Sequence, residues 1–405
     1  MKRQTMLDRL KQILQKPALR RRISEPDAPL PATAWQTRFS ERQITNLLAS
    51  AEAGNTTDWF QFQARMLQGW PHFAAISASR ARSVERMAFS LASGGSSKAD
   101  FKAVDLVRES LLQNDLLQSA LPHLLTAQRL GFAASEIVWE ADEKTWLPVA
   151  LTPIAHQRIG FSGNSFGLYM PGSARTSPFA PGKVVMFRPF VTSNPQPVMD
   201  GFGWPLAHFW LYSDFGLKAW GSFIEKFSKP LMLGKYHRGA STDDKSVLKK
   251  AITNMGRNAA AIIPEEMLIE FVETGLRPGA YHEPMLRYLD RAASKLVLGQ
   301  DSTTEAISGG HAVSREHNEL RIEIVQADAD ALASCLGNQL LHWLVQLNIP
   351  EASTPRLIIA PPKAFDMNEY RANLGVAQQA GLPVSKIQFY ELTGIHPPAE
   401  ASDVL

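Results

Sequence analysis

Residues 163–167, Gly-Asn-Ser-Phe-Gly, have the G-x-S-x-G spacing with which many hydrolases present a serine nucleophile. That chemistry needs a strand before the serine and a helix after it, so that the hydroxyl stands beside an oxyanion hole. Around Ser165, residues 160–172 alternate short apolar runs with turn residues, and no helical pattern follows. We therefore predict a β-hairpin tip, with a serine hydrolase using Ser165 as an alternative function.

The sequence shows no phosphate-binding loop. Gly182 and Lys183 precede a β-like run, but they lack the upstream glycine and the following serine or threonine of a Walker A loop. Residues 201–203, Gly-Phe-Gly, lack the third glycine of a dinucleotide-binding loop and are closely followed by Pro205. We therefore expect no nucleotide cofactor.

Metal chemistry is equally weakly supported. His311 and His317, with Glu316, could be drawn as ligands, but a spacing of six across two glycines is not a zinc pattern, and we interpret them as surface or packing side chains. The single Cys335 excludes a disulfide framework and any cysteine-built metal site. We expect no cofactor, no metal and no enzymatic activity.

The net charge of +3 is unevenly distributed along the 405 residues. Residues 1–23 carry eight basic side chains, among them Arg20, Arg21 and Arg22, against the single acid Asp8, so the remainder is mildly acidic. A protein that grips nucleic acid tightly usually has a basic body. We therefore expect any nucleic acid to be held loosely or through local basic spots. No apolar run approaches the ~20 residues of a membrane helix, so we expect no membrane partner.

The elements that would position functional side chains change character along the chain. A short amphipathic helix and a proline-rich extended arm occupy residues 1–34, and residues 40–130 follow a helical pattern that opens with a Ser40/Gln43 capping box. In this stretch a helix after Pro71 has Arg80 on a polar position, and Pro122 marks a kink or break.

Residues 135–192 are β-like, and residues 204–227 form a helix that is apolar on nearly all sides. Such a helix must be buried all round, either in one core or between subunits. A β–α–β unit follows over 231–273, and then a helix over 281–298. Four apolar residues of that helix should share one buried face: Met285, Leu289, Ala292 and Leu296.

The C-terminal third begins with a polar, glycine-bearing loop at 299–313. A helix from Ser314 to about Leu347 would span ~50 Å at 1.5 Å per residue, which suits an elongated subunit. A further helix is expected at 366–380. From the residues alone the chain is an elongated, oligomer-forming protein without catalysis, and a small-molecule or peptide-binding scaffold is a second alternative.

Several segments resemble the portal proteins of Mu-like bacteriophages. Residues 131–140 are similar to that family's G-F-s-x-x-E-i-x-W-e strand, and residues 204–236 to a segment ending in P-x-x-x-G-k-Y. Residues 260–271 resemble its a-a-i-i-P run and residues 290–305 its d-x-x-i-S-k-x-i-l-G-Q-t-l-T-t motif, while Pro71-His72 fits an early helix. The matching positions in the second and fourth segments are Trp220, Phe223, Glu225, Phe227, Pro230, Gly234, Lys235, Tyr236, Asp290, Ser294, Lys295, Leu298, Gly299, Gln300, Thr303 and Thr304.

The resemblance implies a mainly helical α+β fold, the phage portal fold with wing, stem, clip and tunnel-loop regions. It implies a homo-oligomeric ring of twelve subunits at one capsid vertex of the virion, assembled in the host cytoplasm. Double-stranded DNA would pass through the ring without sequence-specific contact. The implied protein partners are the terminase large subunit, capsid and scaffold proteins, and head-completion or tail adaptor proteins.

By chain order, the resemblance implies nine regions. They are a basic helix and arm (1–34), a helical wing part (35–115), a first stem helix and strand (116–147), a β-rich clip (148–203), a second stem helix (204–228), an α/β wing part (229–298), a tunnel loop (299–313), a long helix (314–348) and a C-terminal helical region serving as a short crown or tail (349–405). The implied DNA-channel residues are Gln300, Asp301, Ser302, Thr303, Thr304, Glu305, Ser308, His311 and Arg315. The implied subunit-interface residues are Trp204, Trp210, Phe215, Trp220, Phe223, Arg20, Arg21 and Arg22.

Overall fold

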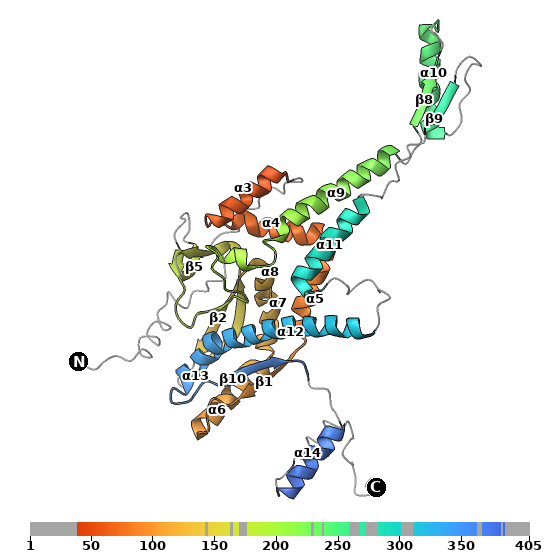
Figure 1. Ribbon diagram of the computed structural model, residues 1–405. Coiled ribbons are helices and arrows are strands. Elements are labelled where there is room, and N and C mark those ends of the chain that lie inside the picture. Colours follow the sequence, from red (N-terminus) through yellow and green to blue (C-terminus); the bar gives the residue numbers. More distant parts are fainter. Residues whose placement is uncertain are drawn as a thin grey trace, which may run out of the picture. The chain divides into compact units, whose positions relative to one another are not determined.

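A computed structural model of the chain is shown in Figure 1. The contacts within it divide the chain into two units, Met1–Ile359 and Ala360–Leu405, which are described separately. The residues that the structure describes are 39–141, 145–162, 165–169, 176–227, 231–236, 239–258, 268–272, 282–300, 311–362, 367–381 and 384. The expected N-terminal helix and arm, with Arg20, Arg21 and Arg22, lie outside these residues.

Helices predominate and small antiparallel sheets are interspersed among them, so the prediction of a mainly helical α+β fold is confirmed. The described elements are α3 (Glu41–Glu52), α4 (Thr57–Gly69), α5 (Pro71–Glu85), β1 (Ala88–Ala92), α6 (Lys98–Val107), α7 (Leu116–Leu124), α8 (Ala127–Leu130), β2 (Ala133–Ala141), β3 (Trp146–Ile154), β4 (Ile159–Ser162), β5 (Ser165–Tyr169), β6 (Thr176–Pro178), β7 (Val184–Phe187), α9 (Leu206–Phe227), β8 (Leu231–Lys235), α10 (Thr242–Asn258), β9 (Leu268–Val272), α11 (His282–Leu298), α12 (His311–Leu336), α13 (His342–Asn348), β10 (Arg356–Ala360) and α14 (Met367–Gln379).

The first helices begin where local chemistry predicts. The Ser40 hydroxyl accepts from the Gln43 backbone N–H, and the Gln43 side chain accepts from the Ser40 N–H, so the predicted capping box is confirmed. Pro71 occupies the first turn of α5, where a missing N–H costs nothing. Of the kink or break predicted at Pro122, the break is wrong, because Pro122 lies inside α7; the chain turns before it, at Asp115, which has φ 51°.

The β-rich segment forms two three-stranded antiparallel sheets. In one, β2 is central between β3 and β7; in the other, β5 is central between β4 and β6. The pairing of Ala134 with both Ile154 and Met186 sets the register of the first sheet. Elsewhere β1 pairs with β10, and β8 pairs antiparallel with β9 around α10, which confirms the predicted β–α–β unit.

The predicted long helix is present, but it starts at His311 rather than Ser314. It runs through α12, a π-helical segment at Gly337–Leu341 and α13 as far as Asn348. In the second unit, α14 confirms the helix expected at 366–380.

Two clusters of buried apolar side chains form the interior of the first unit. One joins α6, α7, α12 and α13 with β2 and β7, and the other joins α4, α5, the start of α9 and α11. Trp59, Phe62 and Phe73 are among the largest fully buried side chains. Burying each of these contributes roughly 1.5–3 kcal/mol, before the entropic cost of ordering it. The second cluster fixes one end of both α9 and α11.

Candidate functional site

Helices α9 and α11 pack against each other in opposite directions. The rings of Phe223 and His282 lie 6.0 Å apart, near the end of α9 and the start of α11. Further along, a Cβ at Gly216 would lie only 3.3 Å from Cδ2 of Leu286, so the absence of a side chain permits this close approach. The two helices therefore form an antiparallel pair, and β8, α10 and β9 lie between them in the sequence (Figure 1).

The first turns of α9 are anchored in the chain's own core. Leu206 and Leu211 are buried, and the Trp210 ring makes an edge contact with Phe62 at 5.2 Å. Just before the helix, the Trp204 ring lies 4.8 Å from that of Trp59. These two tryptophans, expected at a subunit interface, thus contact residues of the same chain.

Beyond Leu211 four large apolar or aromatic side chains of α9 are exposed. Tyr212, Phe215, Leu217 and Ile224 have 48%, 41%, 59% and 44% of their surface accessible. Of the two alternatives for this helix, burial within one core is therefore wrong, because only its first two turns reach the core of the single chain. Burial between subunits stays a prediction.

The exposed apolar residues of α9 fall on two flanks. At 100° per residue, Leu217 and Ile224 lie on one side of the Gly216 face that contacts α11, and Phe215 lies on the other. The side opposite α11 is polar and carries an ion pair between Asp214 and Lys218. The predicted interface residues Trp220 and Phe223 are half-buried, while Phe215 is exposed.

Helix α11 is held by side chains from the start of α5. Trp70 Nε1 donates to Asp290 Oδ1 at 2.7 Å, and His72 Nε2 lies 2.6 Å from Ser294 Oγ. The exposed edge of α11 therefore has a defined orientation relative to α5.

The buried face of α11 differs from the predicted one. Leu289, Ala293 and Val297 are buried, whereas Met285 and Leu296 are 38% and 44% exposed. The observed buried face is rotated about the helix axis relative to the predicted one, because α11 packs between α9 and α5 and both helices contribute to its burial.

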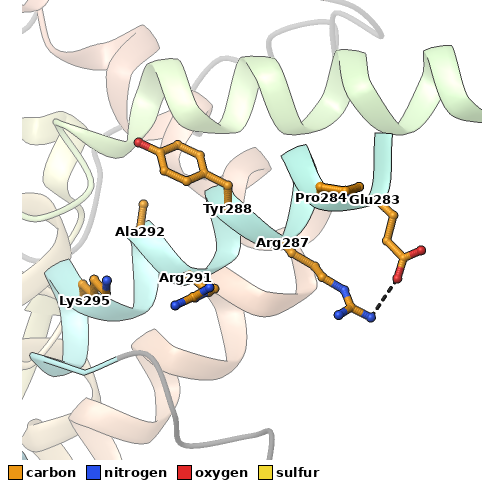
Figure 2. A pocket seen from close by; sticks show the side chains of 7 residues that line it. All are labelled: Glu283, Pro284, Arg287, Tyr288, Arg291, Ala292 and Lys295. Atoms are coloured by element: carbon orange, nitrogen blue, oxygen red, sulfur yellow. Dashed lines mark ion pairs between the residues drawn. The ribbon is translucent and has the colours of Figure 1, made fainter. Parts of the chain in front are cut away.

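The exposed side of α11 forms a shallow depression with a volume of about 750 Å³. Figure 2 shows Tyr288 on the side of α9 and Arg287 on the opposite side, where its Nη2 pairs with Glu283 Oε1 at 2.7 Å. Arg287, Arg291 and Lys295 follow one another at four-residue spacing. The lining residues are Glu283, Pro284, Arg287, Tyr288, Arg291, Ala292 and Lys295.

The predicted tunnel loop adjoins the end of α11. Gly299 ends the helix with φ +75°, and Gln300 is buried, with 5% exposure. His311 begins α12, so the loop ends before residue 313, where the sequence had placed its boundary. Arg315 also belongs to α12, and the structure does not describe the side chains of either residue. The remaining channel candidates, Asp301, Ser302, Thr303, Thr304, Glu305 and Ser308, lie outside the described residues.

The sequence placed Arg80 on a polar position of its helix and did not predict the buried polar network around it. Its guanidinium donates to Asp328 and to the Val297 carbonyl oxygen at 2.7 Å, and Gln128 Nε2 donates to the same carboxylate at 2.7 Å. Arg80 and Asp328 are 6% and 2% exposed. The network connects α5, α8, α11 and α12.

The Gly182-Lys183 pair contacts the central strand β2. Lys183 Nζ lies 3.0 Å from Glu136 Oε1, with side chains 8% and 0% exposed. Trp139 Nε1 donates to the Gly182 carbonyl oxygen at 2.7 Å. Both members of the pair are therefore engaged in holding the sheet, which agrees with the absence of a phosphate-loop pattern around them.

Ser165 occupies the first position of β5 and pairs with Ser162 in the β4–β5 hairpin, as predicted. It is followed by strand residues rather than a helix, so the nucleophile-elbow geometry is not formed. The side chains of His311, Glu316 and His317 are outside the description. Among the described residues, no group of three or more His, Cys, Asp or Glu side chains is placed to hold a metal ion. Within the same residues, no helix combines the length and apolar character needed to span a membrane.

Two half-buried histidines meet beside α8. The rings of His123 and His156 are 5.2 Å apart, and Phe60 and Phe132 also contact His156. Burial, together with the charges of His123 and Arg129, lowers the pKa of His156 to about 3. Burial also lowers the pKa of His123. Both imidazoles are therefore held neutral at physiological pH.

Comparison with known proteins connects these elements to a family. A family model described as the portal protein of Mu bacteriophage matches residues 61–395. The chain belongs to this portal protein family. The family match thus begins within α4 and extends beyond the end of α14.

Two curated relatives of the portal family match the chain. The portal protein of Escherichia phage Mu is 26% identical over 340 residues, which are 81% of this chain and 64% of the phage protein. Mu-like prophage FluMu protein gp29 of Haemophilus influenzae is 27% identical over 208 residues, 50% of this chain and 39% of that protein. The chain spans less than two thirds of the length of either relative.

A solved structure supports the portal fold. The chain is similar to the neck of a native gene transfer agent particle computed with C12 symmetry, with a TM-score of 0.54 at 12% identity, covering 88% of this chain and 100% of that chain. Two of the segments that resemble the portal family contain residues that contact other elements. In residues 131–140, Glu136 and Trp139 contact Lys183 and Gly182. In residues 290–305, Asp290 and Ser294 contact Trp70 and His72 at the start of α5.

Proposed function

We propose that the chain is a portal subunit that assembles into a ring at one vertex of a phage capsid and conducts double-stranded DNA during packaging and ejection. Family membership supports this function, and the C12 symmetry of the similar particle neck supports twelve copies. The particle would contain the ring at its capsid vertex, after assembly in the host cytoplasm.

The observation that carries the proposal is the pair of exposed apolar flanks on α9. In a closed ring each subunit has two neighbours, and it offers a different surface to each of them. A helix with apolar residues on both sides of its anchored face, Leu217 and Ile224 on one and Phe215 on the other, matches that requirement. An isolated chain would leave these side chains in water, at a cost that assembly removes.

The helix pair also supports a revised assignment of the regions. The segment expected as the first stem helix, 116–147, holds the short α7 and α8, whose apolar faces belong to the chain's own core. We propose instead that α9 and α11, with 22 and 17 residues, are the two stem helices. Residues 228–281 between them would form the clip, and the sheets of residues 148–203 would belong to the wing.

A portal subunit of this kind needs no catalysis of its own. The terminase large subunit would supply ATP hydrolysis, and capsid, scaffold, head-completion and tail adaptor proteins would bind the ring at its outer surfaces. The mildly acidic body beyond the N-terminal arm would repel phosphate and so let duplex slide. The scaffold alternative predicts a defined pocket and a 1:1 complex, and the depression on α11 is open and lined by one helix.

Light scattering combined with negative-stain imaging of the purified protein tests the proposal. We expect a ring with a central opening, either spontaneously or in the presence of capsid and scaffold proteins. A protein that stays monomeric under all these conditions would contradict the ring. Hydrolysis of ester substrates that is lost in Ser165→Ala would instead support the hydrolase alternative.

A further inference from the structure

We propose that the row Arg287, Arg291 and Lys295 on α11 is a contact site for the phosphate backbone of DNA. This inference rests on the proposed function, and it assigns to particular side chains the local basic contacts expected on a mildly acidic body. The three side chains line the open depression of about 750 Å³ in Figure 2, and all three residues are exposed.

The spacing of the row suits a backbone rather than a base. Four residues of helix rise about 6 Å, so the first and third cations are about 12 Å apart along α11. Phosphates of one strand repeat every ~3.4 Å along the duplex axis, and the row is therefore long enough to meet several of them. Cations on flexible side chains that contact phosphates do not distinguish base sequences. A conduit for a whole genome requires such sequence-independent contact.

The position of the row points to the same ligand. At 100° per residue, Leu289 and Ala293 lie on the side of α11 opposite the row, and both are buried, so the basic edge stays turned outward. Lys295 stands four residues before Gly299, where the predicted tunnel loop begins. The row thus ends next to the segment that the family resemblance implies as the tunnel loop.

Glu283 makes the site weak. Its carboxylate lies 2.7 Å from Arg287 Nη2, and a phosphate must compete with it for that guanidinium. The partners are 46% and 63% exposed, so the ion pair itself stabilises the protein little. A built-in competitor allows phosphate to be touched and released, as sliding DNA needs.

The experiment measures binding of a fluorescein-labelled 30-base-pair duplex of arbitrary sequence over a series of salt concentrations. For the triple variant R287Q/R291Q/K295Q we expect the slope of log affinity against log salt to fall in magnitude by two to three units, since each lost phosphate contact removes ~0.9. The control K98Q/K102Q/R108Q removes the same number of charges from exposed positions on and just after α6, and its slope should change by less than one unit. Equal changes in both variants would overturn the site.

A second variant is expected to change duplex affinity in the opposite direction. Glu283→Gln removes the competing carboxylate, so duplex affinity should rise several-fold, whereas Glu109→Gln, the same charge change at another exposed position, should have a smaller effect. No difference between the two would count against the site.

Light scattering on every variant separates this inference from the proposed function. If wild type forms rings and R287Q/R291Q/K295Q binds DNA with the affinity of wild type, the proposed site is wrong and the proposed ring is unaffected. If this variant lost ring formation but kept its salt slope, the row would bind a second copy of the chain, and the site would again be wrong. A wild-type protein that forms no ring would contradict the proposed function. The difference between the salt slopes of wild type and R287Q/R291Q/K295Q would still show whether the row contacts DNA.

Discussion

Arg80 and Asp328 form a two-point ion pair in the interior of the protein, although 248 residues separate them in the sequence. Nε of Arg80 lies 2.7 Å from Oδ2 of Asp328, and Nη2 lies 2.9 Å from Oδ1. Gln128 and the Val297 carbonyl complete the hydrogen bonds of the two groups. Because these partners come from four helices, the pair sets where α12 lies against α5, α8 and α11.

Asp328→Asn should destabilise the protein strongly, because it leaves the guanidinium of Arg80 buried without its counter-charge. Breaking such a pair from one side typically costs ~3–5 kcal/mol. Urea unfolding followed by circular dichroism would measure the loss. The double variant R80M/D328L removes both charges and should recover much of it. A single variant as stable as wild type would show that the pair does not hold these helices together.

The sequence could not predict this network for a physical reason. A helical pattern assigns residues to faces, and Arg80 follows Phe73 and Ile76 on a helix whose buried side is broad. Whether an arginine at the edge of that side is exposed depends on a partner far away along the chain. Asp328, on a helix rich in small residues, gives no local sign that it is this partner.

Local chemistry was more predictable than helix orientation. The Ser40 capping box, the hairpin at Ser165 and the long helix predicted from Ser314 follow from residues close together in sequence, although that helix begins three residues earlier, at His311. The buried face of α11 was predicted wrongly because two neighbouring helices, unknown from the sequence, divide it between them. For the same reason the candidate interface residue Trp210 proved to be part of the chain's own core.

Acid should weaken the fold through the histidine pair. His156 has a pKa of about 3 in the folded chain, chiefly because it is buried, against ~6.5 when unfolded. Below pH 6.5 the unfolded state therefore binds a proton that the native state refuses, and stability falls as pH falls. Between pH 7 and 5 this amounts to ~2 kcal/mol for His156 alone, at 1.36 kcal/mol per pH unit, and His123 adds to it in the same direction.

Urea unfolding at pH 7 and pH 5 checks the effect of the histidine pair. His156→Gln should flatten the difference between the two pH values, because the amide does not titrate. His208→Gln, at an exposed position on α9, serves as the control and should leave the difference unchanged. If wild type loses no stability at pH 5, the two imidazoles are not held neutral by the fold.

The apolar flank of α9 should matter for assembly and little for the fold of one chain. Leu217 and Ile224 are 59% and 44% exposed, so L217N/I224N removes few contacts within the subunit. We expect light scattering to show loss of rings while circular dichroism and the thermal midpoint of the subunit stay within a few degrees of wild type. L320N/I322N on α12 is a matched control, since those side chains are 48% and 44% exposed. Rings that persist in L217N/I224N would exclude this flank as a subunit contact.

Replacing residues 301–310 with a Gly-Ser segment of equal length should separate assembly from DNA handling. The replacement starts after the buried Gln300 and ends before α12, so the described helices keep their ends. We expect rings of normal size, together with a severalfold loss of DNase-protected DNA in particles assembled with the altered subunit. The same replacement at residues 170–175, between β5 and β6, should leave protected DNA near the wild-type amount. If the 301–310 replacement abolished ring formation, the segment would be part of the subunit contact rather than of the channel.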